Sequence, residues 1–188
     1  SGLETEDNEF IDSIKLILGE EGTVTRDGRE FQIEKVSPNG NCLFNAILQQ
    51  VTPTGNVTDL RRNIIKAIET KAQSDPAYKE LVIAHIREDW YVSYSNILGT
   101  ITDNELLSKY FEIMSHDPVA YTQTINGVKY PNAMFWGGHL ELTELALQLG
   151  ITIGILSSRN DSILMIPEGA EANPTTIYLY YTGNHYNI

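Results

Sequence analysis

The chain is poor in the residues that build several common kinds of site. It has 188 residues but a single cysteine, Cys42, so no disulfide can form within it and a reducing compartment is expected. A cysteine-rich zinc site is excluded for the same reason. The four histidines are not placed at helical ligand spacings. We therefore expect neither a metal site nor a cofactor.

Basic residues are also scarce. Lysine and arginine number 13 against 25 aspartates and glutamates, which gives a net charge of −12. Nucleic acid is not expected as a partner, because phosphate contacts require clustered lysines and arginines. An anionic membrane surface is disfavoured for the same reason. A basic protein partner fits better, since long-range attraction would speed its encounter with an acidic domain.

Long hydrophobic runs are missing. The longest apolar run in the C-terminal half, Ile151 to Leu156, is interrupted by Thr152 and Gly154. It is far shorter than the roughly 20 residues that cross a bilayer as a helix. No signal peptide is visible, although the chain starts at Ser1 and a removed targeting segment stays open. A cytoplasmic location is the expectation.

What is present is an ordinary globular composition, with 41% hydrophobic and 20% charged residues. Neither repeats nor linkers divide the sequence, so we expect a single domain over residues 1–188.

Asp27-Gly28 predicts a hairpin turn, and Asp103 is the expected cap of a helix. Helices are expected at about 8–19, 42–48, 57–73, 76–98, 103–116 and 139–149; strands at 23–26, 29–36, 151–156, 162–166 and 175–181; loops with short elements at 117–135. This order predicts an α+β fold with a late sheet packed against helices.

Cys42 stands where a polar loop becomes a helix. The free N–H groups and the macrodipole at a helix start favour a thiolate, which is the nucleophilic form of cysteine. Gly40 permits a positive φ, and the N–H groups of Asn39, Gly40 and Cys42 could converge on an oxyanion. The alternative is that Cys42 is a small buried hydrophobe after an ordinary Pro-Asn-Gly turn.

His185 is the best-placed base. It follows Cys42 by about 140 residues, and papain-like chains separate the two residues by roughly 130–150. If a strand continues through this segment, Asn187 lies on the same face and its amide can orient the imidazole. His139 is a weaker candidate base, because a positive charge at a helix start opposes the helix dipole.

Three segments together resemble the ovarian-tumour (OTU) family of deubiquitinases. The first resembles the family's cysteine box, the second its Trp-Gly-Gly segment with the helix that follows, and the third its terminal histidine box. In chain order they are Asn39-Gly40-Asn41-Cys42-Leu43-Phe44-Asn45-Ala46-Ile47, Trp136-Gly137-Gly138-His139-Leu140-Glu141-Leu142 and Asn184-His185-Tyr186-Asn187.

The resemblance implies a papain-like cysteine protease of OTU type, whose central, mostly antiparallel sheet is packed between helices. It implies hydrolysis of the bond after the C-terminal Gly-Gly of ubiquitin, through an acyl-enzyme on Cys42 with His185 shuttling the proton. Trp136, Gly137 and Gly138 would line a narrow substrate cleft. Ubiquitin and polyubiquitin chains are the implied partners of a monomeric enzyme.

Two features stay open within this resemblance. Family members usually carry aspartate where this chain has Asn39, so either Asn39 or Asn187 could support His185, and we expect activity to survive. Residues 57–116 fall where the family's variable helical arm docks ubiquitin. The apolar stripe of Leu60, Ile64 and Ile68 could equally complete the core.

Three other interpretations compete with a deubiquitinase. The same scaffold could cleave another ubiquitin-like modifier, and the catalytic boxes do not separate the two. The Asn39 change could leave a catalytically weak ubiquitin-binding module, against which the intact Cys42 and His185 argue. A plain structural domain would make all three segments coincidental. The unusual helical middle suggests a bacterial effector, which would act in the host cytosol.

Overall fold

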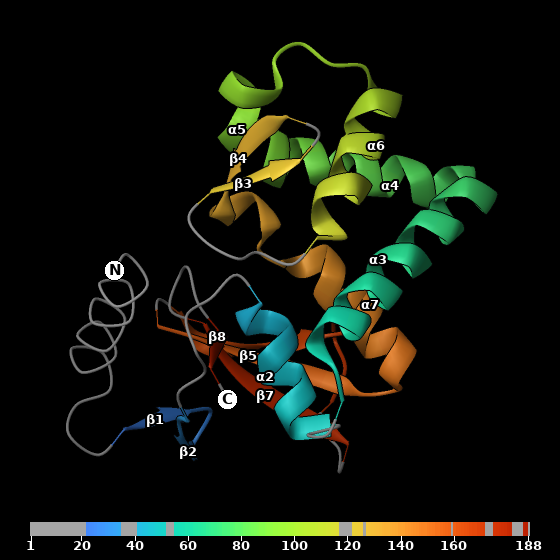
Figure 1. Cartoon of the computed structure of the whole chain (residues 1–188). Coiled ribbons are helices and arrows are strands. Elements are labelled where there is room, and N and C mark those ends of the chain that lie inside the picture. The colour runs from blue at the N-terminus through green and yellow to red at the C-terminus, as the bar shows by residue number, and fades with distance from the viewer. Residues whose placement is uncertain are drawn as a thin grey trace.

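The computed structural model describes residues 22–34, 41–51, 55–116, 122–125, 127–158, 160–171, 175–181 and 186–187 (Figure 1). The helix expected at 8–19 lies outside these residues. The elements in chain order are β1 (Thr23–Arg26), β2 (Arg29–Gln32), α2 (Cys42–Val51), α3 (Val57–Ser74), α4 (Pro76–His85), the π-helix η1 (Ile86–Tyr91), α5 (Val92–Leu98), α6 (Asp103–Met114), β3 (Thr122–Ile125), β4 (Val128–Pro131), the 3₁₀ helix η2 (Asn132–Phe135), α7 (His139–Leu149), β5 (Thr152–Ser157), β6 (Asn160–Ile166), β7 (Thr176–Tyr181) and β8 (Tyr186–Asn187).

The largest sheet has four strands in the order β6-β5-β7-β8. β5 runs antiparallel to β6 and parallel to β7, and β7 runs antiparallel to β8. The α+β class and the mostly antiparallel sheet are therefore confirmed. Figure 1 shows this sheet with α2 lying across it, while α4, α5 and α6 lie together at the opposite end of the molecule.

The two faces of the sheet bury different sets of side chains, as the alternation along a strand requires. Ile153, Ile155 and Leu179 join the main core with residues of α2 and α7. Leu156 and Tyr180 face the other way, into a smaller cluster with side chains of the β1–β2 region. The sheet is thus covered by helices on one face and by the first hairpin on the other.

That first hairpin forms as the Asp-Gly signal predicts. Asp27 and Gly28 both have positive φ, 52° and 74°, which suits the tight turns of two-residue hairpins. Arg29 lies 5.1 Å from the ring centres of both Phe31 and Tyr178, which attaches the hairpin to β7. The second strand ends at Gln32, earlier than expected.

The long helix α3 connects the sheet to the helical end of the molecule (Figure 1). Ile64 and Ile68 on it are buried, and Leu60 packs against the same core. The packing interpretation of this stripe is therefore confirmed. At the start of α6 the expected cap was wrong by one residue. The cap is Thr102 and not Asp103. The Thr102 hydroxyl oxygen accepts from the backbone N–H of Glu105, and the Glu105 carboxylate accepts from the backbone N–H of Thr102.

Two local features differ from the sequence expectation. The helix expected over 76–98 is interrupted by the π-helix η1, where Ile86 and Trp90 are both buried. The segment expected as loops contains the β3–β4 hairpin, in which Ile125 pairs with Val128. Asn126-Gly127 between these strands is a strong hairpin signal that the sequence interpretation missed.

Candidate active site

Cys42 is the first residue of α2. The carbonyl of Asn41 accepts from the N–H of Asn45 at 2.8 Å, so the helical hydrogen bonds begin directly at the cysteine. Cys42 is 6% exposed, and Leu43 and Phe44 after it are fully buried. A thiol at this position faces the positive end of the helix dipole, which stabilises the thiolate.

The C-terminal strand lies beside this helix. β8 pairs with β7, so that Asn187 stands opposite Tyr180, and α2 packs against both strands. The backbone at Asn187 thereby comes alongside the cysteine-bearing helix. His185 directly precedes β8 but lies outside the described residues, as do Asn39 and Gly40. Their arrangement around Cys42 remains a prediction, and so does the orientation of the Asn187 side chain.

The Trp136-Gly137-Gly138 segment lies against the first turn of α2. A Cβ atom added at Gly137 would stand 3.3 Å from side-chain carbons of both Leu43 and Phe44. Only a residue without a side chain fits there without displacing these neighbours. Trp136 is 39% exposed, although Met134 and Phe135 directly before it are fully buried. The segment therefore offers a surface beside the cysteine helix.

A buried carboxylate that the sequence interpretation missed holds this segment in place. Glu141 is 4% exposed, and its Oε2 accepts from the N–H of Gly138 at 2.8 Å. Its Oε1 accepts from the hydroxyl of Tyr110, which comes from α6. Burial, together with the negative charge of Glu141, raises the pKa of Tyr110 well above its usual value, so the hydroxyl stays protonated as a donor. A glutamate at the third position of a helix is half of a capping box, which was the available signal.

Trp136 also lines a small cavity of about 330 Å³. The π-helix η1 forms part of its wall through Asp89 and Trp90. His139, the weaker candidate base, stacks there against His85, with ring centres 5.8 Å apart. The imidazole of His139 is therefore engaged with α4.

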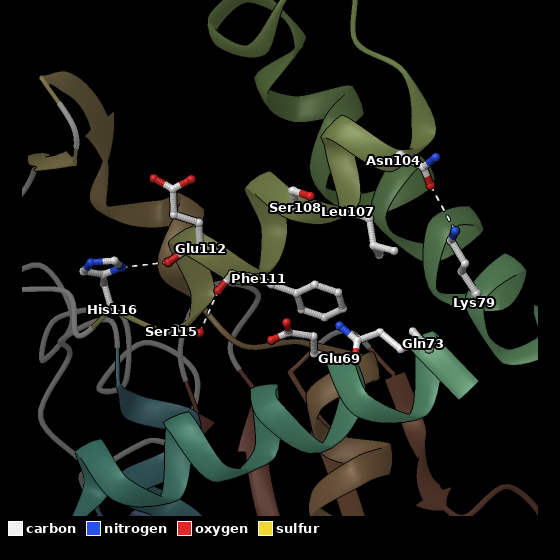
Figure 2. Close-up of a pocket in the computed structure, with 11 residues that line it drawn as sticks. Glu69, Gln73, Lys79, Asn104, Leu107, Ser108, Phe111, Glu112, Ser115 and His116 are labelled. Carbon is white, nitrogen blue, oxygen red and sulfur yellow. Dashed lines mark hydrogen bonds between the residues drawn. The ribbon is translucent and has the colours of Figure 1, made fainter. Parts of the chain in front are cut away.

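A larger cavity of about 760 Å³ lies between α3, α4 and α6. Figure 2 shows its polar rim, where Lys79 donates to Asn104 at 2.9 Å and His116 contacts the Glu112 carbonyl oxygen at 2.7 Å. None of its lining residues belongs to the cysteine, Trp-Gly-Gly or histidine segments. We place the candidate chemistry at Cys42 despite the greater size of this cavity, because the nucleophile is there.

Within the described ranges, no three histidine, cysteine, aspartate or glutamate side chains gather in a way that could hold a metal ion. None of the helices described in the structure is long and apolar enough to cross a membrane.

Comparison with known proteins agrees with this geometry. A model of the family described as OTU-like cysteine protease matches residues 37–186, which include the first two segments and all of the third except Asn187. A protein named deubiquitinase OTUD6B, from Xenopus tropicalis, is 25% identical over 167 residues, covering 85% of this chain and 46% of that protein. The chain thus spans about half the length of the curated relative it matches.

Solved structures resemble the fold. An ovarian tumour (OTU) domain in complex with ubiquitin aligns with a TM-score of 0.54 at 17% identity, over 89% of this chain and 76% of that one. The OTU of Hazara virus, bound to ubiquitin, aligns with a TM-score of 0.47 at 16% identity, over 82% of this chain and 77% of that one. The first of these likenesses shows that the folds agree.

Proposed function

This chain belongs to the OTU-like cysteine protease family, and we propose that it is a deubiquitinase that hydrolyses peptide and isopeptide bonds after the C-terminal Gly-Gly of ubiquitin. The observation that carries the proposal is Cys42, the first residue of a buried helix, with the Trp-Gly-Gly segment and β8 packed beside that helix. The names of the curated relative and of the similar structures point to the same substrate.

In the proposed reaction the Cys42 thiolate attacks the carbonyl carbon of the terminal glycine. The resulting oxyanion accepts hydrogen bonds from the backbone N–H groups of Asn39, Gly40 and Cys42. His185, oriented by Asn187 or Asn39, gives a proton to the leaving amine as the C–N bond breaks. Water then attacks the thioester with His185 as base, which releases the carboxylate and restores the cysteine.

The low exposure of Cys42 supports a glycine-ended substrate. Because Cys42 is only 6% exposed and a Cβ at Gly137 would stand 3.3 Å from Leu43 and Phe44, we expect the approach to the thiol to be narrow. A tail of two glycines presents no side chains to such a passage, whereas larger residues would collide with its walls. Trp136 and Gly138 would contact the tail on the same side.

The finer expectations follow from the same proposal. Polyubiquitin chains would be the substrates, the helices of residues 57–116 would dock the ubiquitin body, and the enzyme would act as a single-domain monomer in the cytoplasm. If the chain is a bacterial effector, that compartment is the host cytosol. The net charge of −12 suits a substrate whose contacting surface is basic.

Steady-state cleavage of ubiquitin dimers and of fluorogenic ubiquitin-like modifiers tests this function. We expect cleavage of ubiquitin by the wild-type protein and none by Cys42→Ala. Preference for another modifier would overturn the choice of ubiquitin while keeping the reaction. Binding of ubiquitin without turnover of any linkage would instead indicate a binding module.

A further inference from the structure

Arg61 of α3 is completely buried, with an exposed fraction of 0%. A buried guanidinium is costly unless acceptors surround it. Its Nε donates to Asn41 Oδ1 at 2.7 Å, its Nη2 to the carbonyl of Phe135 at 2.7 Å, and its Nη1 to the carbonyl of Met114 at 3.1 Å. Its charged carbon also lies 4.6 Å from the centre of the Phe44 ring.

These contacts reach both sides of the candidate active site. Asn41 immediately precedes Cys42, and its carbonyl begins the hydrogen bonding of α2. Phe135 immediately precedes Trp136, at the start of the segment that lies against α2. Phe44 is in the first turn of α2, and a Cβ added at Gly137 would stand 3.3 Å from its ring. The Arg61 side chain thus bonds both to Asn41, directly before Cys42, and to Phe135, directly before Trp136.

The shape of the guanidinium makes this link directional. Its N–H groups point outward in one plane at fixed angles, whereas a lysine ammonium is a compact charge on a flexible stem. The two shortest bonds, both 2.7 Å, go to the two segments that flank the site. Misplacing reacting groups by about 1 Å can cost roughly a hundredfold in rate. Arg61 therefore sets the spacing between Asn41 and Phe135.

We propose that Arg61 is a positioning residue, which holds the start of α2 and the Trp136-Gly137 wall at the separation that the reaction at Cys42 requires. The proposal rests on the proposed function for its substrate but concerns a residue outside the three catalytic segments. In this role Arg61 acts through Asn41 and Phe135, to which its two shortest hydrogen bonds go.

Kinetics of Arg61→Lys and Asn41→Ala with a fluorogenic ubiquitin substrate test the proposal, at a temperature well below each variant's Tm. We expect Arg61→Lys to lower kcat at least about tenfold with little change in KM. Lysine keeps the positive charge but lacks the planar, fixed arrangement of N–H donors. Asn41→Ala should lower kcat less, and the double variant little more than Arg61→Lys alone, because both changes break one link.

Glu144→Ala is the matched control for a folding defect. Glu144 is equally buried, at 2% exposure, and pairs with Lys71 at 2.8 Å, a link between α3 and α7 that touches neither Asn41 nor Phe135. It should lower Tm and leave kcat unchanged. An unchanged kcat in Arg61→Lys, or an equal loss in Glu144→Ala, would overturn the proposal. Should Arg61→Lys not fold, an unchanged kcat in Asn41→Ala would overturn it as well.

Alkylation of Cys42 by iodoacetamide separates this inference from the proposed function. If the wild-type protein turned over no ubiquitin substrate, the proposed function would fail, but the alkylation rate would still report the surroundings of Cys42. We expect that rate to change severalfold in Arg61→Lys and to stay at the wild-type value in Glu144→Ala. Equal rates in all three proteins would refute a positioning role whatever the substrate.

Discussion

The half of the molecule built on the sheet and the half built on α3 to α6 differ in how their sequences relate to function. The sheet half carries the cysteine, Trp-Gly-Gly and histidine segments that identify the chemistry. The helical half carries no such motif, yet Arg61 and Tyr110 extend from it to the backbone around those segments. In the proposed function the motifs supply the reacting groups, and the difference between the halves is that buried polar side chains of the helical half bond to the backbone beside those motifs.

Replacing His185, the proposed general base, should have the largest effect on kcat, and this loss should be specific to the sheet half. We expect His185→Ala to lower kcat by roughly 10²–10⁴-fold, because a positioned general base contributes about that much. Thermal unfolding should be nearly unchanged. His116→Ala in the helical half, where the imidazole contacts the Glu112 carbonyl oxygen, is the control and should keep full kcat. Similar losses in both variants would remove His185 from its role.

Breaking the link between the halves should cost stability. Tyr110→Phe removes the hydroxyl that donates to the buried Glu141, leaving that carboxylate short of a partner. We expect the free energy of unfolding to fall by about 1–3 kcal/mol in urea titrations. In Tyr91→Phe, which loses an exposed hydrogen bond to Gly99, the change should be about 0.5 kcal/mol. Equal losses in the two variants would show that the Glu141 link is not special.

Two adjacent glycines give a sharper contrast within the sheet half. Gly137→Ala forces a methyl group to within 3.3 Å of Leu43 and Phe44 and should cost about 1–3 kcal/mol of stability. In Gly138→Ala the new methyl group meets only Glu141 Oε2, at 3.8 Å, and the φ of −145° at this position suits any residue. It should be tolerated. Urea titrations in which Gly138→Ala is the more harmful change would contradict the packing described for this segment.

Several features of the fold and the position of Cys42 could be predicted from the sequence, because their signals are local. The Asp27-Gly28 turn, the apolar stripe of Ile64 and Ile68 and the Gly150 stop of α7 each depend on a few neighbouring residues, and each was confirmed. Cys42 at a helix start was readable for the same reason, and the structure confirms that position.

The rest depends on contacts between distant segments. The acceptors of Arg61 lie 20, 53 and 74 residues away along the chain, so its burial could not be inferred from the helix that carries it. The π-helix η1 is similar, because Trp90 is buried there with its indole donating to the Met134 carbonyl, 44 residues further on. Local propensity does not encode such partners, and tertiary packing decides them.

The smallest expected effect is the response of the helical half to alkali. Burial, with the charges of Glu144 and Glu141 nearby, raises the pKa of Tyr78 from 10.0 to about 12, and burial beside the charge of Glu141 raises the pKa of Tyr110 well above its usual value. Below about pH 10 both states keep these protons, so the stability is fully present there. As pH rises from about 10 to 12 the unfolded chain ionises first, and stability falls.

Urea titrations at about pH 9 and pH 11 measure that fall. Tyr78→Phe should lose less stability between the two values than the wild-type protein, because it lacks one of the ionising groups. Tyr78 is only partly buried, so solvent screening will reduce the difference. If Tyr78→Phe lost as much stability between the two pH values as the wild-type protein, Tyr78 would be excluded as a source of the pH dependence.

The central claim is that Cys42 is an activated nucleophile in a cleft that accepts ubiquitin. The most direct measurement is intact mass spectrometry of the protein after incubation with ubiquitin that carries a thiol-reactive group at its C-terminus. We predict a one-to-one adduct that is absent in Cys42→Ala and forms far more slowly in His185→Ala. A wild-type protein that forms no adduct, or a Cys42→Ala protein that still forms one, would contradict the account.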